Sequence, residues 1–358
     1  MTAGHALASA HSRVGVGGRA HGRFVLLLGL GTLAVVLGVV VGVAVGTVGI
    51  APGDTLAVVL GHLGLQVGAV PSEAVDAIVW DLRIPRVLTA LAVGAALAVA
   101  GVTFQGLLRN PLADPYVLGT ASGAALGAAI AVLIPVKTLV LGFGLVHALA
   151  FAGALVAVWA VYRLSRIAGM APMTGLLLTG YAVGSLLAAG LTMAMYLSGA
   201  QLRQIFAFLL GGFDGASWTR LAGALPLIAI GCALILVRAR SLNGLLLGEE
   251  AAAHLGVDVR RERGVLLGLA SLVTAAAVTV SGLIGFVGLV VPHVVRLVVG
   301  PNARQVLPLS LVWGAALLIY ADVAARLLGE IPVGVVTAII GAPFFLFLLR
   351  RTRTGYEL

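Results

Sequence analysis

Residues 87–108, VLTALAVGAALAVAGVTFQGLL, contain no charged side chain, and this stretch decides the fold class. About 20 apolar residues in a helix cross the roughly 30 Å hydrocarbon core of a bilayer. Backbone groups in lipid must bond within their own segment, so such a run has to be helical. Similar runs recur throughout the chain, of which 61% of residues are hydrophobic and 10% charged. A soluble domain typically carries about 25% charged residues. The sequence therefore predicts an all-α polytopic membrane protein.

Working outward from this stretch, we expect about ten transmembrane helices. Their predicted ranges are 24–50, 84–107, 115–134, 138–162, 172–198, 221–237, 264–282, 283–299, 305–325 and 332–349.

These spans divide the chain into a long membrane domain with two short ends. Residues 1–23 are polar and glycine-rich and are expected to form a disordered cytoplasmic tail. Residues 24–350 form the transmembrane domain, and 351–358 a cytoplasmic C-terminal tail. The boundary near residue 282 is the least defined, because glycines punctuate one continuous apolar stretch there.

The distribution of basic residues predicts the orientation. With a cytoplasmic N-terminus, sixteen of the twenty-two Arg and Lys residues lie inside. Cytoplasmic loops carry such an excess, so we expect an N-in, C-in arrangement. The six on the outside are Arg83, Arg86, Lys137, Arg203, Arg220 and Arg326. The net charge is +9, but the basic residues are distributed over short loops. This distribution is typical of membrane topology and does not indicate nucleic-acid binding.

Glycines spaced four apart, as in Gly38, Gly42 and Gly46, let helices approach closely in lipid. This pattern predicts tight packing within the bundle, and a self-dimerising face is the alternative. The single cysteine, Cys232, excludes a disulfide framework, and no metal-ligand cluster is present in the sequence.

The chain carries no recognisable source of energy for transport. A phosphate-binding loop needs Gly-Lys-Ser/Thr, and the only lysine, Lys137, follows a valine. No predicted span has a charge near its centre, whereas ion-coupled carriers usually place carboxylates there. We therefore expect no catalytic residue, no cofactor in this chain, and ATP hydrolysis in a separate subunit. A self-contained carrier or channel remains the less favoured alternative.

The longest cytoplasmic loop, 238–263, is the strongest candidate for contact with such a subunit. Asn243 and Gly244 are expected to break the chain, Glu249 and Glu250 to open a short helix, and Gly256 to end it. Leu247, Ala251 and Leu255 then share one face. The helix would either dock an ATPase or rest on lipid.

Four segments resemble a known family. They are Arg83-Ile-Pro-Arg86; Gln105-Gly-Leu-Leu-Arg-Asn-Pro-Leu-Ala-Asp-Pro115; Leu247-Gly-Glu-Glu-Ala-Ala-Ala-His-Leu-Gly256; and the stretch from Gly285-Phe-Val-Gly-Leu-Val-Val-Pro-His293 to Pro343. In this order they resemble the FecCD-type permeases of ATP-binding-cassette importers, which carry ferric siderophores, haem and vitamin B12. The resemblance covers nearly the whole chain except the first fifty residues and the region 135–170.

The resemblance implies a homodimeric type II importer permease in the bacterial cytoplasmic membrane. Two ATPase subunits that bind ATP and Mg²⁺, together with an extracytoplasmic binding protein, would complete the assembly. The substrate class favoured is an iron(III)-siderophore chelate, with vitamin B12 or haem as alternatives.

Three groups of site residues follow from the resemblance. Arg83, Arg86 and Arg326 would meet carboxylates of the binding protein, although they could instead anchor helix ends. Met173 and Thr174 would lie at the cytoplasmic gate, where the family often has small polar residues, from which Met173 departs. The residues of the ATPase-coupling loop are Gly244, Leu247, Gly248, Glu249, Glu250, Ala251, Leu255 and Gly256.

Overall fold

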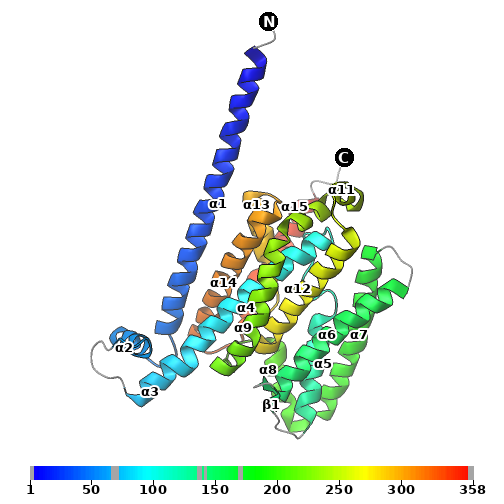
Figure 1. Ribbon diagram of the computed structural model, residues 1–358. Coiled ribbons are helices and arrows are strands. Elements are labelled where there is room, and N and C mark those ends of the chain that lie inside the picture. Colours follow the sequence, from blue (N-terminus) through cyan, green and yellow to red (C-terminus); the bar gives the residue numbers. More distant parts are fainter. Residues whose placement is uncertain (1–3, 66–71, 135–138, 141–142, 168–171, 354–358) are drawn as a thin grey trace.

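The computed structural model describes residues 4–65, 72–134, 139–140, 143–167 and 172–353. The described residues form a bundle of helices together with one two-stranded antiparallel ribbon, in which β1 (Leu139–Val140) pairs with β2 (Phe143–Gly144). The sequence predicted an all-helical chain, and apart from this ribbon the described regular structure is helical (Figure 1).

Each of the ten predicted ranges overlaps a helix, and the range 138–162 also includes the ribbon. These helices are α1 (Gly4–Ala44), α4 (Ile84–Leu107), α5 (Thr120–Leu133), α6 (Leu145–Ile167), α7 (Pro172–Leu197), α9 (Trp218–Val237), α12 (Val259–Ser281), α13 (Val287–Val299), α14 (Ala303–Leu327) and α15 (Val333–Arg353).

Shorter elements lie between them. They are α2 (Pro52–His62), α3 (Glu73–Asp76), the π-helix η1 (Ala77–Arg83), the 3₁₀-helix η2 (Gly199–Gln201), α8 (Leu202–Leu210), α10 (Ala239–Leu247) and α11 (Glu249–His254). Within the described part of the chain, seven helical segments are long and apolar enough to cross a membrane, and α5, α13 and most of α15 add three shorter apolar helices.

Helix α4 forms the centre of the bundle. It is buried along almost its whole length and packs against α9, α12, α13 and α14 (Figure 1). Glycines permit this packing: a Cβ atom on Gly94 would collide with the carbonyl oxygen of Gly314, and one on Gly101 with that of Gly288. The predicted role of glycine in close helix packing is confirmed at these crossings.

Gly38 and Gly42 of α1, and Gly46 just after it, also pack against other helices of the same chain. Cβ atoms added at Gly38, Gly42 and Gly46 would meet side chains of α14, α4 and η1, including Tyr320 and Val87. In this structure the series therefore serves packing between helices of one subunit, as expected, and its glycines are covered by that subunit.

The ends of the chain differ from the expected tails. Helix α1 begins at Gly4, inside the predicted disordered segment 1–23, and α15 continues to Arg353, inside the predicted tail 351–358. At the C-terminal end the physical reason is composition, because no glycine or proline follows Pro343 until residue 355. Residues 4–23 contain no proline, and their helix forms despite five glycines. Residues 354–358 lie outside the described residues.

A partly buried non-helical segment, residues 282–286, separates α12 from α13 and fixes the boundary that the sequence left open. Gly282 has φ +66°, which stops the helix. The backbone N–H of Leu283 donates to the Phe208 carbonyl (3.1 Å), and that of Ile284 to the Tyr116 hydroxyl (3.2 Å). Irregular backbone within a membrane protein requires such internal partners.

Candidate functional site

The three arginines expected at the outer surface lie together where α1, η1, α4 and α14 meet. Arg83 ends η1, Arg86 lies in the first turn of α4, and Arg326 in the last turn of α14. Only 5% of Arg83 and 6% of Arg326 is exposed, so neither side chain presents its charge on the surface of this chain. The side chain of Arg86 is 14% exposed.

The end of α1 explains why these arginines are buried. The last four carbonyl groups of a helix have no partner within it and need donors from elsewhere. Arg83 donates to the carbonyl oxygens of Val43 (3.0 Å) and Ala44 (2.9 Å). Arg326 donates to those of Gly42 (2.9 Å) and Val45 (2.6 Å). Two guanidinium groups thus cap α1 and attach it to the bundle.

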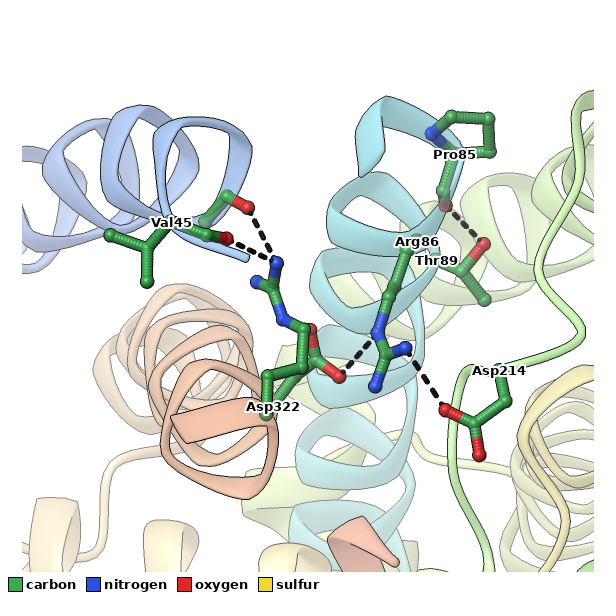
Figure 2. A network of polar contacts seen from close by, with 8 residues as sticks. Val45, Pro85, Arg86, Thr89, Asp214 and Asp322 are labelled. Carbon is green, nitrogen blue, oxygen red and sulfur yellow. Dashed lines mark hydrogen bonds and ion pairs between the residues drawn. The ribbon is translucent and has the colours of Figure 1, made fainter. Parts of the chain in front are cut away.

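A buried carboxylate holds the arginines together. Asp322 is 1% exposed; its oxygens lie 2.8 Å from Nε of Arg86 and 3.1 Å from Nε of Arg326. Arg86 also pairs with Asp214, which precedes α9 and is mostly exposed, at 2.9 Å (Figure 2). We name Arg83, Arg86, Asp214, Asp322 and Arg326 the arginine network. Asp322 and Arg326 lie four residues apart on α14, which places both side chains on one face of that helix.

At the other end of α4, the predicted coupling loop folds into two short helices. Gly248, with φ +122°, separates α10 from α11, and Gly256, with φ +77°, follows α11. The predicted start at Glu249 and stop at Gly256 agree with the structure. The predicted break at Asn243 and Gly244 is wrong, because both lie inside α10.

Polar contacts with distant segments stabilise the loop. The Asn243 side chain pairs with Asn302 (2.8 Å) and accepts from the Ala303 backbone N–H (2.7 Å), which joins α10 to the start of α14. Arg109, just after α4, donates to the Leu245 carbonyl (3.0 Å). These bonds explain why Asn243 supports a helix here.

The surface of the loop divides into a packed side and an open side. Gly244 and Ala252 are buried and adjoin each other, so α11 folds back on α10. Leu247 and Leu255 are 69% and 65% exposed, and Glu250 is exposed beside them. Glu249 pairs with Arg263 at 2.6 Å. The arrangement presents two large apolar side chains and a carboxylate on a rigid support.

The remaining predicted residues concern the gate. Met173 and Thr174 lie in the first turn of α7, and their side chains fall outside the residues that the structure describes. Within the described ranges, no group of three His, Cys, Asp or Glu side chains is placed to hold a metal ion.

These features belong to a bundle of apolar helices, and comparison with known proteins gives its class. The model of the FecCD transport family matches residues 33–351. The cobalamin import system permease BtuC of Halobacterium salinarum is 48% identical over 279 residues, covering 78% of this chain and 74% of that protein. The hemin transport system permease HmuU of Yersinia pestis is 44% identical, covering 77% and 84%.

The relationship extends to structure. A solved inward-facing conformation of a metal-chelate type ABC transporter is 30% identical, with a TM-score of 0.76, and the match covers 90% of this chain and 98% of that one. The protein is therefore a permease of the ABC-importer class. It belongs to the FecCD transport family, as the four sequence segments indicated, and is a multi-pass membrane protein.

Proposed function

We propose that this permease imports a large metal chelate, with an iron(III)-siderophore complex as the expected substrate. The observation that supports this class is the likeness to permeases of chelate importers, which extends over most of the chain. Cobalamin and haem are the alternatives, because relatives at 48% and 44% identity are named as permeases for these two compounds.

The working assembly in this proposal contains two copies of the chain, two ATPase subunits that bind ATP and Mg²⁺, and one extracytoplasmic binding protein. Each chain crosses the membrane ten times with both ends in the cytoplasm. The seven long helical segments and three shorter apolar helices support this count, and the excess of basic residues on one side supports the orientation. A homodimer has the symmetry usual for such assemblies.

The loop from α10 to α12 is proposed as the contact with the ATPase. Its exposed Leu247 and Leu255 resemble the apolar anchors found at protein interfaces, and Glu250 adds a charged rim. The internal bonds of Asn243 and Arg109 give the loop a fixed shape. Met173 and Thr174 remain proposed gate residues.

Docking of the binding protein at the opposite end also remains a proposal. The guanidinium groups of Arg83 and Arg326 donate to carbonyl groups of α1. In this proposal these two residues fix the shape of the docking surface and do not touch the binding protein. Arg86 and Asp214 are the more accessible members of the network and would make the contact.

Uptake by reconstituted transporter tests the function. The permease, its ATPase and its binding protein are placed in proteoliposomes, and entry of labelled cyanocobalamin, haemin and a ferric hydroxamate chelate is measured. We expect ATP-dependent uptake of one of the three, and none with an ATPase unable to hydrolyse ATP. Uptake that proceeds without ATPase would instead support a self-contained carrier.

A further inference from the structure

A charged cavity borders the coupling loop, with which it shares Glu249, and extends away from the loop to α6 and α7. It has a volume of about 470 Å³ and lies between the ends of α6 and α12, with α7 and α11 also contributing. Its polar lining consists of Tyr162, Ser165, Arg166, Glu249, Arg260 and Arg263.

The charges in this cavity do not balance. Three arginines and one glutamate give a formal charge of +2. Glu249 pairs with Arg263 at 2.6 Å. Arg166 and Arg260, which are both exposed, therefore do not share this carboxylate. The guanidinium of Arg166 lies 5.6 Å from the centre of the Tyr162 ring. The Ser165 hydroxyl already donates to the Tyr162 carbonyl (3.0 Å), so the arginines and the Tyr162 hydroxyl remain as donors. Arginine side chains lining one cavity suit a phosphate, which accepts paired N–H donors.

The surroundings identify where such a phosphate would come from. The cavity lies at the ends of apolar helices, and on α6 the side chain of Trp159, one turn before Tyr162, is 63% exposed, with Val156 a further turn away 61% exposed. On α7, Leu178 is 54% exposed. Aromatic side chains followed by arginines mark the depth of lipid headgroups, and apolar side chains beyond them contact acyl chains. A phospholipid could therefore place its headgroup in the cavity and its acyl chains against the exposed apolar side chains.

We propose that this cavity binds the phosphodiester headgroup of an anionic phospholipid, with its acyl chains along the exposed faces of α6 and α7. The proposal rests on the proposed orientation, in which this end of the bundle meets the cytoplasmic leaflet. The Arg263–Glu249 pair joins the cavity to α11. A headgroup competing for Arg263 would loosen that pair, so lipid composition would affect the coupling loop.

Lipid retention by the purified full-length chain provides the test. Native mass spectrometry measures how much phosphatidylglycerol and phosphatidylcholine remain bound after equal exposure to both. We expect wild type to prefer phosphatidylglycerol. In Arg166→Gln/Arg260→Gln the ratio of bound phosphatidylglycerol to bound phosphatidylcholine should fall roughly tenfold. Arg163→Gln is the matched control, because this exposed arginine lies three residues earlier on α6 and does not line the cavity. It should retain lipid like wild type.

A second variant keeps the test decisive if the double variant folds poorly. Glu249→Gln removes the competing carboxylate and should increase phosphatidylglycerol retention. Equal retention of both lipids by wild type, unchanged retention in the double variant, or full displacement by free inorganic phosphate would overturn the proposal. If the double variant Arg166→Gln/Arg260→Gln lost ATPase binding but retained lipid like wild type, the cavity would instead receive an acidic segment of the ATPase. The measurement needs no transport, so its failure is distinguishable from failure of the proposed function.

Discussion

Replacing Asp322 with asparagine removes the carboxylate that lies between Arg86 and Arg326. Asp322 is 1% exposed, so both guanidinium groups would keep their buried positions without an opposite charge. Breaking a buried ion pair in this way costs about 3–5 kcal/mol. Asparagine can still accept one hydrogen bond, so we expect the lower value of about 3 kcal/mol for Asp322→Asn.

Cys232 provides the assay. It is the only cysteine of the chain and is 4% exposed on α9, so it reacts with a fluorogenic maleimide only as the protein unfolds. One kcal/mol shifts Tm by roughly 2–4 °C in a medium-sized domain, so Asp322→Asn should lower the apparent Tm by roughly 6–12 °C. Asp322→Asn combined with Arg326→Gln should be less destabilised than the sum of the two, because the partners are in contact.

The matched control is Asp214→Asn. Asp214 pairs with the same Arg86, at 2.9 Å, but its side chain is 73% exposed. Exposed pairs contribute about 0–1 kcal/mol, so its Tm should change by at most roughly 4 °C. Equal Tm changes for Asp322→Asn and Asp214→Asn would refute the reasoning. If the arginines served docking alone, Arg326→Ala would weaken binding-protein association and leave Tm unchanged.

Three further changes test other parts of the structure. Glu250→Lys, at an exposed position, should abolish substrate-stimulated ATPase activity with little loss of Tm, and wild-type activity would contradict the coupling role. Gly256→Leu should abolish the activity as well, and it should also lower Tm, because a leucine at φ +77° strains the loop. Gly101→Leu should sharply reduce folded protein, because its side chain would collide with Gly288; Gly268→Leu on α12, where the space is open, is the control, and equal yields would contradict tight packing. Burial raises the pKa of Asp114 to about 6 from its usual value of 3.8. The folded chain therefore binds a proton that the unfolded chain does not, and stability should fall as pH rises from 4 to 7. Tryptophan fluorescence should show this slope reduced in Asp114→Asn, and an unchanged slope would exclude Asp114 as its source.

Hydropathy alone located the helices because each long apolar run must satisfy its backbone internally. The range 84–107 agrees with α4 at both ends, since charged residues lie close to each terminus. The burial of Arg83 could not be predicted in this way. Counting basic residues assigns each side chain to a side of the membrane, whereas the carbonyl groups that receive Arg83 lie about 40 residues earlier in the sequence.

The coupling loop shows the same limit on a smaller scale. Glycines with positive φ marked its real breaks, Gly248 and Gly256, and the latter was predicted. Asn243 was expected to break the chain because asparagine favours turns when its side chain bonds locally. In the structure its amide instead bonds Asn302 and Ala303, about 60 residues later. Local propensity was overridden by a contact that the sequence did not reveal.

Helix α4 is the structural connection between the two proposed contact surfaces (Figure 1). At its start, Arg86 is paired with Asp322 and Asp214; just beyond its end, Arg109 holds the carbonyl of Leu245 in α10. Its 24 residues span roughly 36 Å at 1.5 Å per residue. Gly101 lies so close to α13 that a Cβ atom on it would collide with the Gly288 carbonyl oxygen, so the two helices pack backbone to backbone. We expect a displacement at the arginine network to be transmitted along α4 and, through the bond of Arg109 to Leu245, to α10. This favours tilting of packed helices over local unfolding as the means of coupling substrate delivery to the ATPase.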